Sequence, residues 1–463
     1  MRSIWAVAIN TIKQALRIKI AAAFIILLLI LLPIMGVSMT GDGTLKGRLQ
    51  TFVSYGLSLT SILLCLLTIV ISTYSLTSDI KQKQIYTVIT KPIRRFQLLL
   101  GKLIGVVLLD AALLILFASI IYGITIYMPY FKEVSDSEII QVNNEFYTAR
   151  ASITPPEADV SEKVSQKLKE LEELEKSGQL DISEVFRGLS PQGIIDRITS
   201  QIKLEKRAAE VGRELIWEFN NVKPIDPNES LFVRFKYDVS ITPPDSQVYS
   251  KWIIGDYRQI KYGTPSEVPI YKIPLRRDPV RTFREIEVPA NAVSEDGYLA
   301  VGFLNVPLNN TVVIFPLEDG LEILYKADTF TANFIRAALL IFFRLIFLAC
   351  LGLLASSFLS FPVAILFCLV VFFTAMFSGF VLESFDSLGK NLSSAYSYTI
   401  RPVIQLLPQF DKLNPTKFMV PGRLLGWTLL AKAIGLMVCL KSALLLLIGL
   451  VIFSFREVAK III

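Results

Sequence analysis

The chain contains several apolar runs long enough to cross a membrane, interrupted by one long polar stretch, residues 131–330. A membrane-spanning helix needs about 20 mainly apolar residues. The run at 334–382 is too long for one crossing, and the turn-prone segment Ser356–Pro362 divides it in two. The pattern therefore predicts six spans. The apolar runs cover residues 20–41, 51–78, 103–130, 334–382 and 433–455.

A cleavable signal peptide is the alternative for the first run. The run is longer than the usual hydrophobic region of such a peptide, and no clear small-x-small cleavage site follows it, so a retained span is favoured. In residues 3–19, the apolar positions Ile4, Ala8, Ile12 and Leu16 recur every four residues. This spacing predicts an amphipathic helix on the inner leaflet, with a simple basic tail as the alternative.

Lysine and arginine gather in short segments on one side of the predicted spans, as is typical of cytoplasmic loops. By contrast, residues 40–50 hold only Lys46 and Arg48. We therefore expect a protein of the cell (inner) membrane with both termini cytoplasmic and residues 131–330 outside. The residues assigned to the cytoplasmic side are Arg2, Lys13, Arg17, Lys19, Lys81, Lys83, Lys91, Arg94, Arg95, Lys102, Arg456 and Lys460.

The polar stretch divides into two parts that differ in the spacing of their apolar residues. Residues 155–213 are charged, with apolar positions at helical spacing, and the short stripe is expected to pack within its own domain rather than form a long coiled coil. From Glu214 the pattern changes to period two, in short segments rich in β-branched and aromatic residues, which predicts about eight antiparallel strands. The helical stripe comprises Val160, Val164, Leu168, Leu171 and Leu174.

The expected fold is thus an α-helical polytopic membrane protein of six transmembrane helices with an inserted α+β extracytoplasmic domain that contains an antiparallel β-sandwich. Residues 1–130 would hold the amphipathic helix and spans one to three, and 331–463 spans four to six. Residues 131–213 would form the helical part and 214–330 the sandwich. Trp217, Trp252 and Tyr257 are candidates for a ligand-stacking platform, with core aromatic residues as the alternative.

Composition supports a membrane protein with a sizeable polar part, because 53% of residues are hydrophobic while 19% are charged. The sequence has no histidine, which removes the commonest general base and metal ligand. The four cysteines lie inside apolar runs without a CxxC pair. No metal site is expected, and the net charge of +7 is better explained by membrane-flanking loops than by nucleic acid.

Motifs of enzymes are missing from the sequence. There is no G-x-x-x-x-G-K-[ST], so the chain itself is not expected to bind ATP through a P-loop. There is likewise no HExxH and no G-x-S-x-G, and the carboxylates of the polar stretch show no spacing that marks an acid/base couple. We therefore expect a protein that is not an enzyme, with no catalytic residues.

Three charged residues, Asp110, Arg344 and Lys441, lie deep inside the apolar runs. A charge at that depth is costly and is usually paired or functional. At 1.5 Å per residue from the flanking basic residues, Asp110 and Arg344 differ in depth by about 6 Å. We predict an ion pair between them, within one subunit or across a dimer interface, the alternative being that each contacts water alone. Lys441 is predicted to snorkel outward.

The loop between the second and third spans combines charge with an apolar segment, since residues 79–103 read DIKQKQIYTVITKPIRRFQLLLGKL. Its basic residues would hold the loop in the cytoplasm. A positive-inside anchor, which is the alternative, requires neither the Lys91-Pro92 turn nor an apolar helical face. We therefore predict a short docking helix. Ile85, Val88 and Ile89 form its apolar face, and Gln82, Lys83 and Tyr86 surround that face.

This arrangement resembles the permease subunits of type-2 ABC exporters, in particular the six-span permeases similar to the nitrous-oxide-reductase maturation permease. That family typically carries, after its second span, an acidic residue, a short helix, a Lys-Pro or similar turn, a basic step and a Gly-Lys pair. Asp79, Ile85–Thr90, Lys91-Pro92, Arg94-Arg95 and Gly101-Lys102 stand at these positions. The residues Gln82-Lys83-Gln84 depart from the family's frequent Ser-Gly-Thr. The resemblance covers residues 1–130 and 331–463.

The resemblance implies a permease that pairs with a second permease copy or paralogue in the lipid bilayer and with separate P-loop ATPase subunits. Those subunits would bind ATP and Mg, and the docking helix would pass on their movement. No cofactor is expected in this chain. The alternatives are a non-transporting membrane scaffold whose sandwich binds an envelope glycan or protein, and an extracytoplasmic hydrolase.

Overall fold

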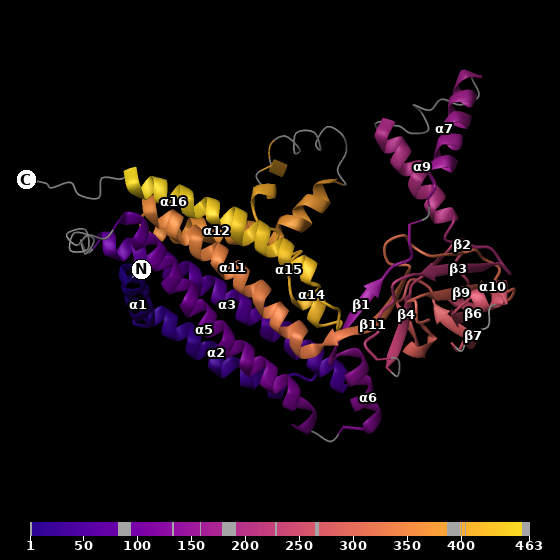
Figure 1. The fold of residues 1–463 in the computed structure, drawn as a ribbon, viewed down its shortest axis with the longest axis horizontal. Coiled ribbons are helices and arrows are strands. Elements are labelled where there is room, and N and C mark those ends of the chain that lie inside the picture. Colours follow the sequence, from indigo (N-terminus) through magenta and orange to yellow (C-terminus); the bar gives the residue numbers. More distant parts are fainter. Residues whose placement is uncertain are drawn as a thin grey trace, which may run out of the picture. The chain divides into compact units, whose positions relative to one another are not determined.

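The computed structural model describes residues 2–81, 94–131, 134–157, 159–177, 191–226, 229–263, 268–386, 399, 401–402 and 404–455. The chain divides into two compact units (Figure 1). The helical unit comprises Met1–Ala149 and Thr329–Ile463, and the sheet unit comprises Arg150–Asp328. Each unit has its own hydrophobic core.

Six helical runs of the helical unit are long and apolar enough to cross a membrane, as predicted for the described part of the chain. Two of them, α3 and α11, are about three-quarters buried along their apolar windows, whereas the first and last runs are about one-quarter buried. The pair α3 and α11 therefore forms the centre of the bundle. The runs are α2 (Lys19–Ser38), α3 (Leu45–Lys81), α5 (Arg95–Tyr127), α11 (Phe330–Phe358), α12 (Phe361–Asp386) and the last run, α15 (Trp427–Ala433), η3 (Ile434–Ser442) and α16 (Ala443–Phe455).

The amphipathic segment is helix α1 (Arg2–Leu16), and it lies along α5 (Figure 1). Its buried residues are Ala8, Thr11 and Ala15, while Leu16 of the expected apolar stripe is exposed. The face of α1 that carries these three small residues packs on α5. Small residues allow two helix backbones to approach closely.

Two features of the C-terminal part interrupt regular α-helix. Residues 404–406 are helical, and residues 407–426, the irregular segment, form turns around the short helix α14 (Thr416–Met419). The middle of the last run, η3, is a π-helix rather than an α-helix. Shorter helices of this unit are η1 (Met128–Phe131) and α6 (Asp136–Glu145).

The described strands form two four-stranded sheets, with strand orders β1-β11-β4-β8 and β3-β9-β6-β7, and a small sheet β2-β10-β5. Every predicted period-two segment appears as a strand. Inward residues of both four-stranded sheets, among them Phe235 of β4 and Phe303 of β9, share one core. The strands are β1 (Thr148–Ile153), β2 (Ala208–Ala209), β3 (Glu214–Phe219), β4 (Ser230–Phe235), β5 (Asp238–Val239), β6 (Gln247–Gly255), β7 (Tyr271–Pro279), β8 (Arg284–Pro289), β9 (Leu299–Asn305), β10 (Val313–Ile314) and β11 (Leu321–Thr329).

Two helices, α7 (Ser161–Lys176) and α9 (Pro191–Glu205), form a separate small core. Val160 and Val164 of the predicted stripe pack against Ile198 and Ile202, so the stripe is used within its own domain. Two strands, β1 and β2, lie in the region where the sequence predicts helices only, and β1 pairs with β11 at the edge of a sheet. The remaining short helices of this unit are α10 (Arg258–Tyr262) and η2 (Ala290–Ala292).

Candidate functional site in the helical unit

The end of α3 and the start of α5 are joined by a buried ion pair. Lys102 Nζ lies 2.6 Å from Asp79 Oδ2, and both residues are buried. Lys102 also donates to the Ser75 carbonyl, and Gln14 of α1 donates to Asp79 Oδ1 at 3.3 Å. A buried charge is stable only when it is paired and its remaining hydrogen-bonding atoms are satisfied. One carboxylate therefore ties together α1, α3 and α5 near the C-terminus of α3.

The first residue of α5 ties the same region to the end of the last run. Arg95 Nη1 donates to the carbonyls of Phe453, at 3.0 Å, and of Ser454. Beneath these bonds, Leu76, Leu99 and Leu353 pack with Phe453 in a small apolar cluster. The two ends of the 82–93 segment thus start from backbone that is fixed to several helices.

Close contact between α1 and α5 depends on two glycines of α5. A Cβ atom at Gly101 would come within 2.7 Å of Val7 Cβ, and one at Gly105 within 2.7 Å of the Ala8 carbonyl oxygen. Both distances are shorter than real side chains allow, so any larger residue would push α1 away. The Gly-Lys pair at Gly101-Lys102 therefore combines a helix contact with the ion pair to Asp79.

Among the predicted docking residues, Asp79, Arg94, Arg95 and Lys102 are described. The structure brings Asp79 and Lys102 into contact and leaves Arg94 exposed at the N-terminus of α5. The sequence contained a signal for the pair, namely opposite charges at the inner ends of consecutive spans, which our interpretation did not use. Gln82, Lys83, Ile85, Tyr86, Val88, Ile89, Lys91 and Pro92 lie outside the described residues.

Arg344 does not pair with Asp110, so the prediction of an ion pair within one chain is wrong. Arg344 donates to Ser61 Oγ at 3.0 Å and to the Phe410 carbonyl at 3.1 Å, and its guanidinium covers the Phe410 ring at 4.8 Å. The side chain thus turns toward the irregular segment 407–426, where the Phe410 carbonyl accepts its hydrogen bond.

Asp110 lies fully buried beside Thr68, whose hydroxyl donates to the Leu64 carbonyl instead. No described residue forms a hydrogen bond with its carboxylate oxygens. Ser61, which contacts Arg344, and Thr68 are seven residues apart on α3, or about 10 Å along the helix. Asp110 and Arg344 therefore contact α3 at different heights and do not pair. The depths predicted from the sequence assumed that each helix is upright and begins at its flanking basic residue.

Lys441 also contacts the irregular segment and the helical turn before it, and its outward snorkelling stays a prediction. Its Nζ donates to the carbonyls of Gln405, at 3.2 Å, and Leu407, at 2.8 Å. Further bonds hold the rest of this segment, since Gln50 donates to the Val420 carbonyl and Asn333 bonds both Arg423 and Leu425. Irregular backbone within a membrane is tolerated where it is buried in protein or lines a cavity.

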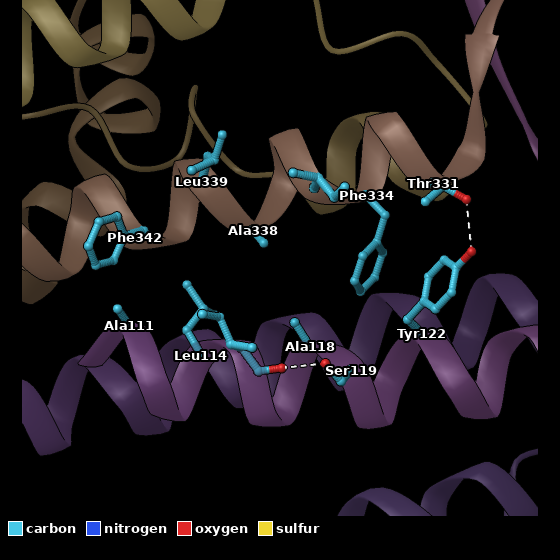
Figure 2. Close-up of a pocket in the computed structure, with 12 residues that line it drawn as sticks. Ala111, Leu114, Ala118, Ser119, Tyr122, Thr331, Phe334, Ala338, Leu339 and Phe342 are labelled. Atoms are coloured by element: carbon cyan, nitrogen blue, oxygen red, sulfur yellow. Dashed lines mark hydrogen bonds between the residues drawn. The ribbon is translucent and has the colours of Figure 1, made fainter. Parts of the chain in front are cut away.

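A separate apolar groove lies between α5 and α11, with a volume of about 490 Å³. Figure 2 shows Ala111, Leu114 and Ala118 of α5 facing Phe334 and Phe342 of α11 across it. At one end the hydroxyls of Tyr122 and Thr331 are hydrogen-bonded at 2.8 Å. The described residues that line the groove carry no charge, and most of them are apolar.

The three aromatic candidates of the sheet unit do not form one platform. Trp252 is 1% exposed and packs against Phe235 and Phe303, so it is a core residue and the stacking prediction is wrong for it. Trp217 is half-buried and lines a cleft of about 870 Å³. The Tyr257 hydroxyl donates to Glu214 at 3.5 Å, and desolvation followed by this carboxylate raises the pKa of Tyr257.

A charged cluster that the sequence did not single out lies near the end of β6. Arg258 donates to both Asp256, at 2.8 Å, and Asp296, at 2.6 Å, and its guanidinium covers the Tyr298 ring at 4.0 Å. Hydrogen bonds from Arg258, together with one from Ser294, hold the pKa of Asp256 below its usual range. These contacts fix two turns to each other, which is a structural role.

Among the described residues no group of three or more Asp, Glu or Cys side chains is placed to hold a metal ion. Comparisons with protein-family models, with curated proteins and with solved structures returned no significant match to the chain.

Proposed function

We propose that this chain is the membrane-spanning permease subunit of an ABC-type exporter, and that a separate ATPase subunit supplies the energy. The observation that carries the proposal is the tie between Asp79, Lys102 and Gln14 at the base of residues 82–93. A segment that transmits force must start from rigid backbone, because a loose attachment would absorb the movement. The tie links it to α3, α5 and α1, and Arg95 links it to the last run.

In this proposal the six apolar runs cross the cell membrane with both termini in the cytoplasm, because the basic flanks lie on that side. The sheet unit is then outside, and its two four-stranded sheets form an antiparallel β-sandwich around their shared core. Dimerisation with a second permease copy or paralogue completes the exporter. ATP and Mg are bound by the ATPase partner.

The test is the double variant Ile85→Asp and Val88→Asp, which places two charges on the predicted apolar face of the docking segment. The tagged full-length chain is purified from its native membranes, and co-purifying ATP hydrolysis that is sensitive to vanadate is measured. We expect activity with the wild type and at least a tenfold loss with the double variant. Lys81→Gln, at the exposed end of α3 and outside the predicted docking residues, serves as the control and should retain the activity. Retention by the double variant, or none with the wild type, would overturn the proposal.

A second candidate function is a scaffold that binds an envelope glycan or protein through the sheet unit. The cleft beside Trp217 favours it, because an aromatic side chain there lies near Lys203 and Arg207. If this is the function, Trp217→Ala should abolish retention of the chain on purified cell-envelope glycan while leaving any co-purifying ATPase unchanged.

A further inference from the structure

A second cavity of the helical unit, of about 340 Å³, lies between the irregular segment and the last helical run. Three lysines line it, Lys412, Lys432 and Lys441, together with the polar residues Gln405 and Gln409. Its described lining contains no carboxylate, and apolar side chains such as Leu429 and Met437 form the rest of the wall. The cavity therefore combines a cationic part with an apolar part.

Lys441 occupies the middle of the run Trp427–Phe455, which is long and apolar enough to cross a membrane. Its amine is held by the Gln405 and Leu407 carbonyls, which accept hydrogen bonds but do not neutralise the charge. Neither Lys441 nor Lys432 forms an ion pair with any residue that the structure describes. A cation at this depth is costly unless a counter-charge is present, so an anion from outside the chain would stabilise it.

The backbone around the cavity is irregular on both sides. One wall includes residues 407–413 of the irregular segment, and the other includes the π-helix η3. π-Helical turns in helices occur frequently at functional sites. Interrupted helices inside membranes are likewise typical of substrate and ion sites in transporters.

We propose that this cavity binds an amphiphile with a phosphate head, and we commit to a membrane lipid as its source. The lysines at positions 432 and 441 would contact the phosphate as compact positive charges. The acyl chain would lie over Leu429 and Met437 and continue along the apolar surface of the last run. The inference concerns binding alone and does not depend on whether the chain is a permease subunit.

The test uses the full-length protein, purified in mild detergent and stripped of lipid, and native mass spectrometry counts the bound molecules. The probes are phosphatidylglycerol and phosphatidylcholine with the same acyl chains, since only the former has net negative charge. We expect the wild type to bind phosphatidylglycerol at least tenfold more tightly. Lys432→Gln and Lys441→Gln together should remove that preference and leave binding of phosphatidylcholine unchanged.

Controls separate binding from folding. Lys417→Gln, which changes a lysine of the same segment that lines a different cavity, should keep the preference. The variant Lys441→Arg retains the positive charge and can still donate to the two carbonyls. This variant should therefore also keep the preference for phosphatidylglycerol. Lys432 is exposed, so Lys432→Gln alone tests the idea if the Lys441 variant is poorly folded. Equal binding of the two lipids by the wild type would overturn the proposal. So would inorganic phosphate that binds as tightly as the lipid.

Discussion

At the scale of single residues, the pair Asp79–Lys102 is the contact with the largest expected effect on stability. Lys102→Met would leave the Asp79 carboxylate buried without its cation, which costs about 3–5 kcal/mol. Asp79→Asn should have a similar effect for the same reason. The double variant should be more stable than either single variant, because it removes both charges. Thermal unfolding of the detergent-purified protein measures this cycle.

The control for this cycle is Lys81→Met, at the exposed end of α3, which should change the unfolding temperature little. Additive losses in the double variant would show that the two side chains do not interact.

The sequence predicted which buried charged residues need partners, but not what those partners are. The apolar runs make Arg344 and Lys441 conspicuous, because charges within such runs need partners. The partners themselves were not predictable, since they are carbonyls of the irregular segment, and nothing in the sequence marks Phe410 or Leu407 as acceptors. The docking residues from Gln82 to Pro92 remain a prediction.

At the scale of elements, the packing of α1 on α5 makes a prediction that distinguishes two glycines of one helix. Gly105→Ala places a methyl group against the Ala8 carbonyl and should destabilise the protein by about 1–3 kcal/mol, as overpacking does. Gly123→Ala is the matched control, because no atom lies within 4 Å of a Cβ there. Since alanine favours helix over glycine, Gly123→Ala should raise stability by up to about 1 kcal/mol.

The measurement is the midpoint of thermal unfolding for both variants under the same detergent conditions. Equal shifts in the same direction would contradict the close approach of α1 to α5.

Elements with a strong pattern were predicted, and weak ones were missed. In strands β4 and β9 every second residue belongs to the shared core, as Leu231, Val233 and Phe235 of β4 do, and this period of two is a strong strand signal. Strand β1 reads TARASI, with small and polar residues that give no such pattern, and its place beside β11 depends on a partner distant in sequence. The π-helix has no sequence signal that we recognise.

At the scale of the whole molecule, the division into two units predicts that residues 148–329, which begin with β1 and end with β11, fold alone. Their core has no disulfide but includes Phe235, Trp252 and Phe303, and a domain of this size can bury enough surface. Urea unfolding followed by tryptophan fluorescence should show one cooperative transition, since Trp252 is buried. Gradual, non-cooperative unfolding of the fragment would contradict independent folding.

The same fragment should lose stability in acid. Folding lowers the pKa values of Asp256 and Asp296, so their contribution is complete above the unfolded value of about 3.9 and is lost as the pH falls below it. Asp256→Asn should therefore unfold more easily than the wild type at pH 7 and show a smaller further loss toward pH 3.

The π-helix η3 changes the directions in which side chains of the last run point around the helix axis. In a regular α-helix, the nine steps from Lys432 to Lys441 would turn by about 900°, which places the two side chains on opposite sides. A helix with i→i+5 hydrogen bonds turns by only about 80° per step, and because most of these nine steps are π-helical, the two directions agree to within about 50°. If the same nine steps wound as a regular α-helix, one of the two lysines would face the opposite side of the run from the other.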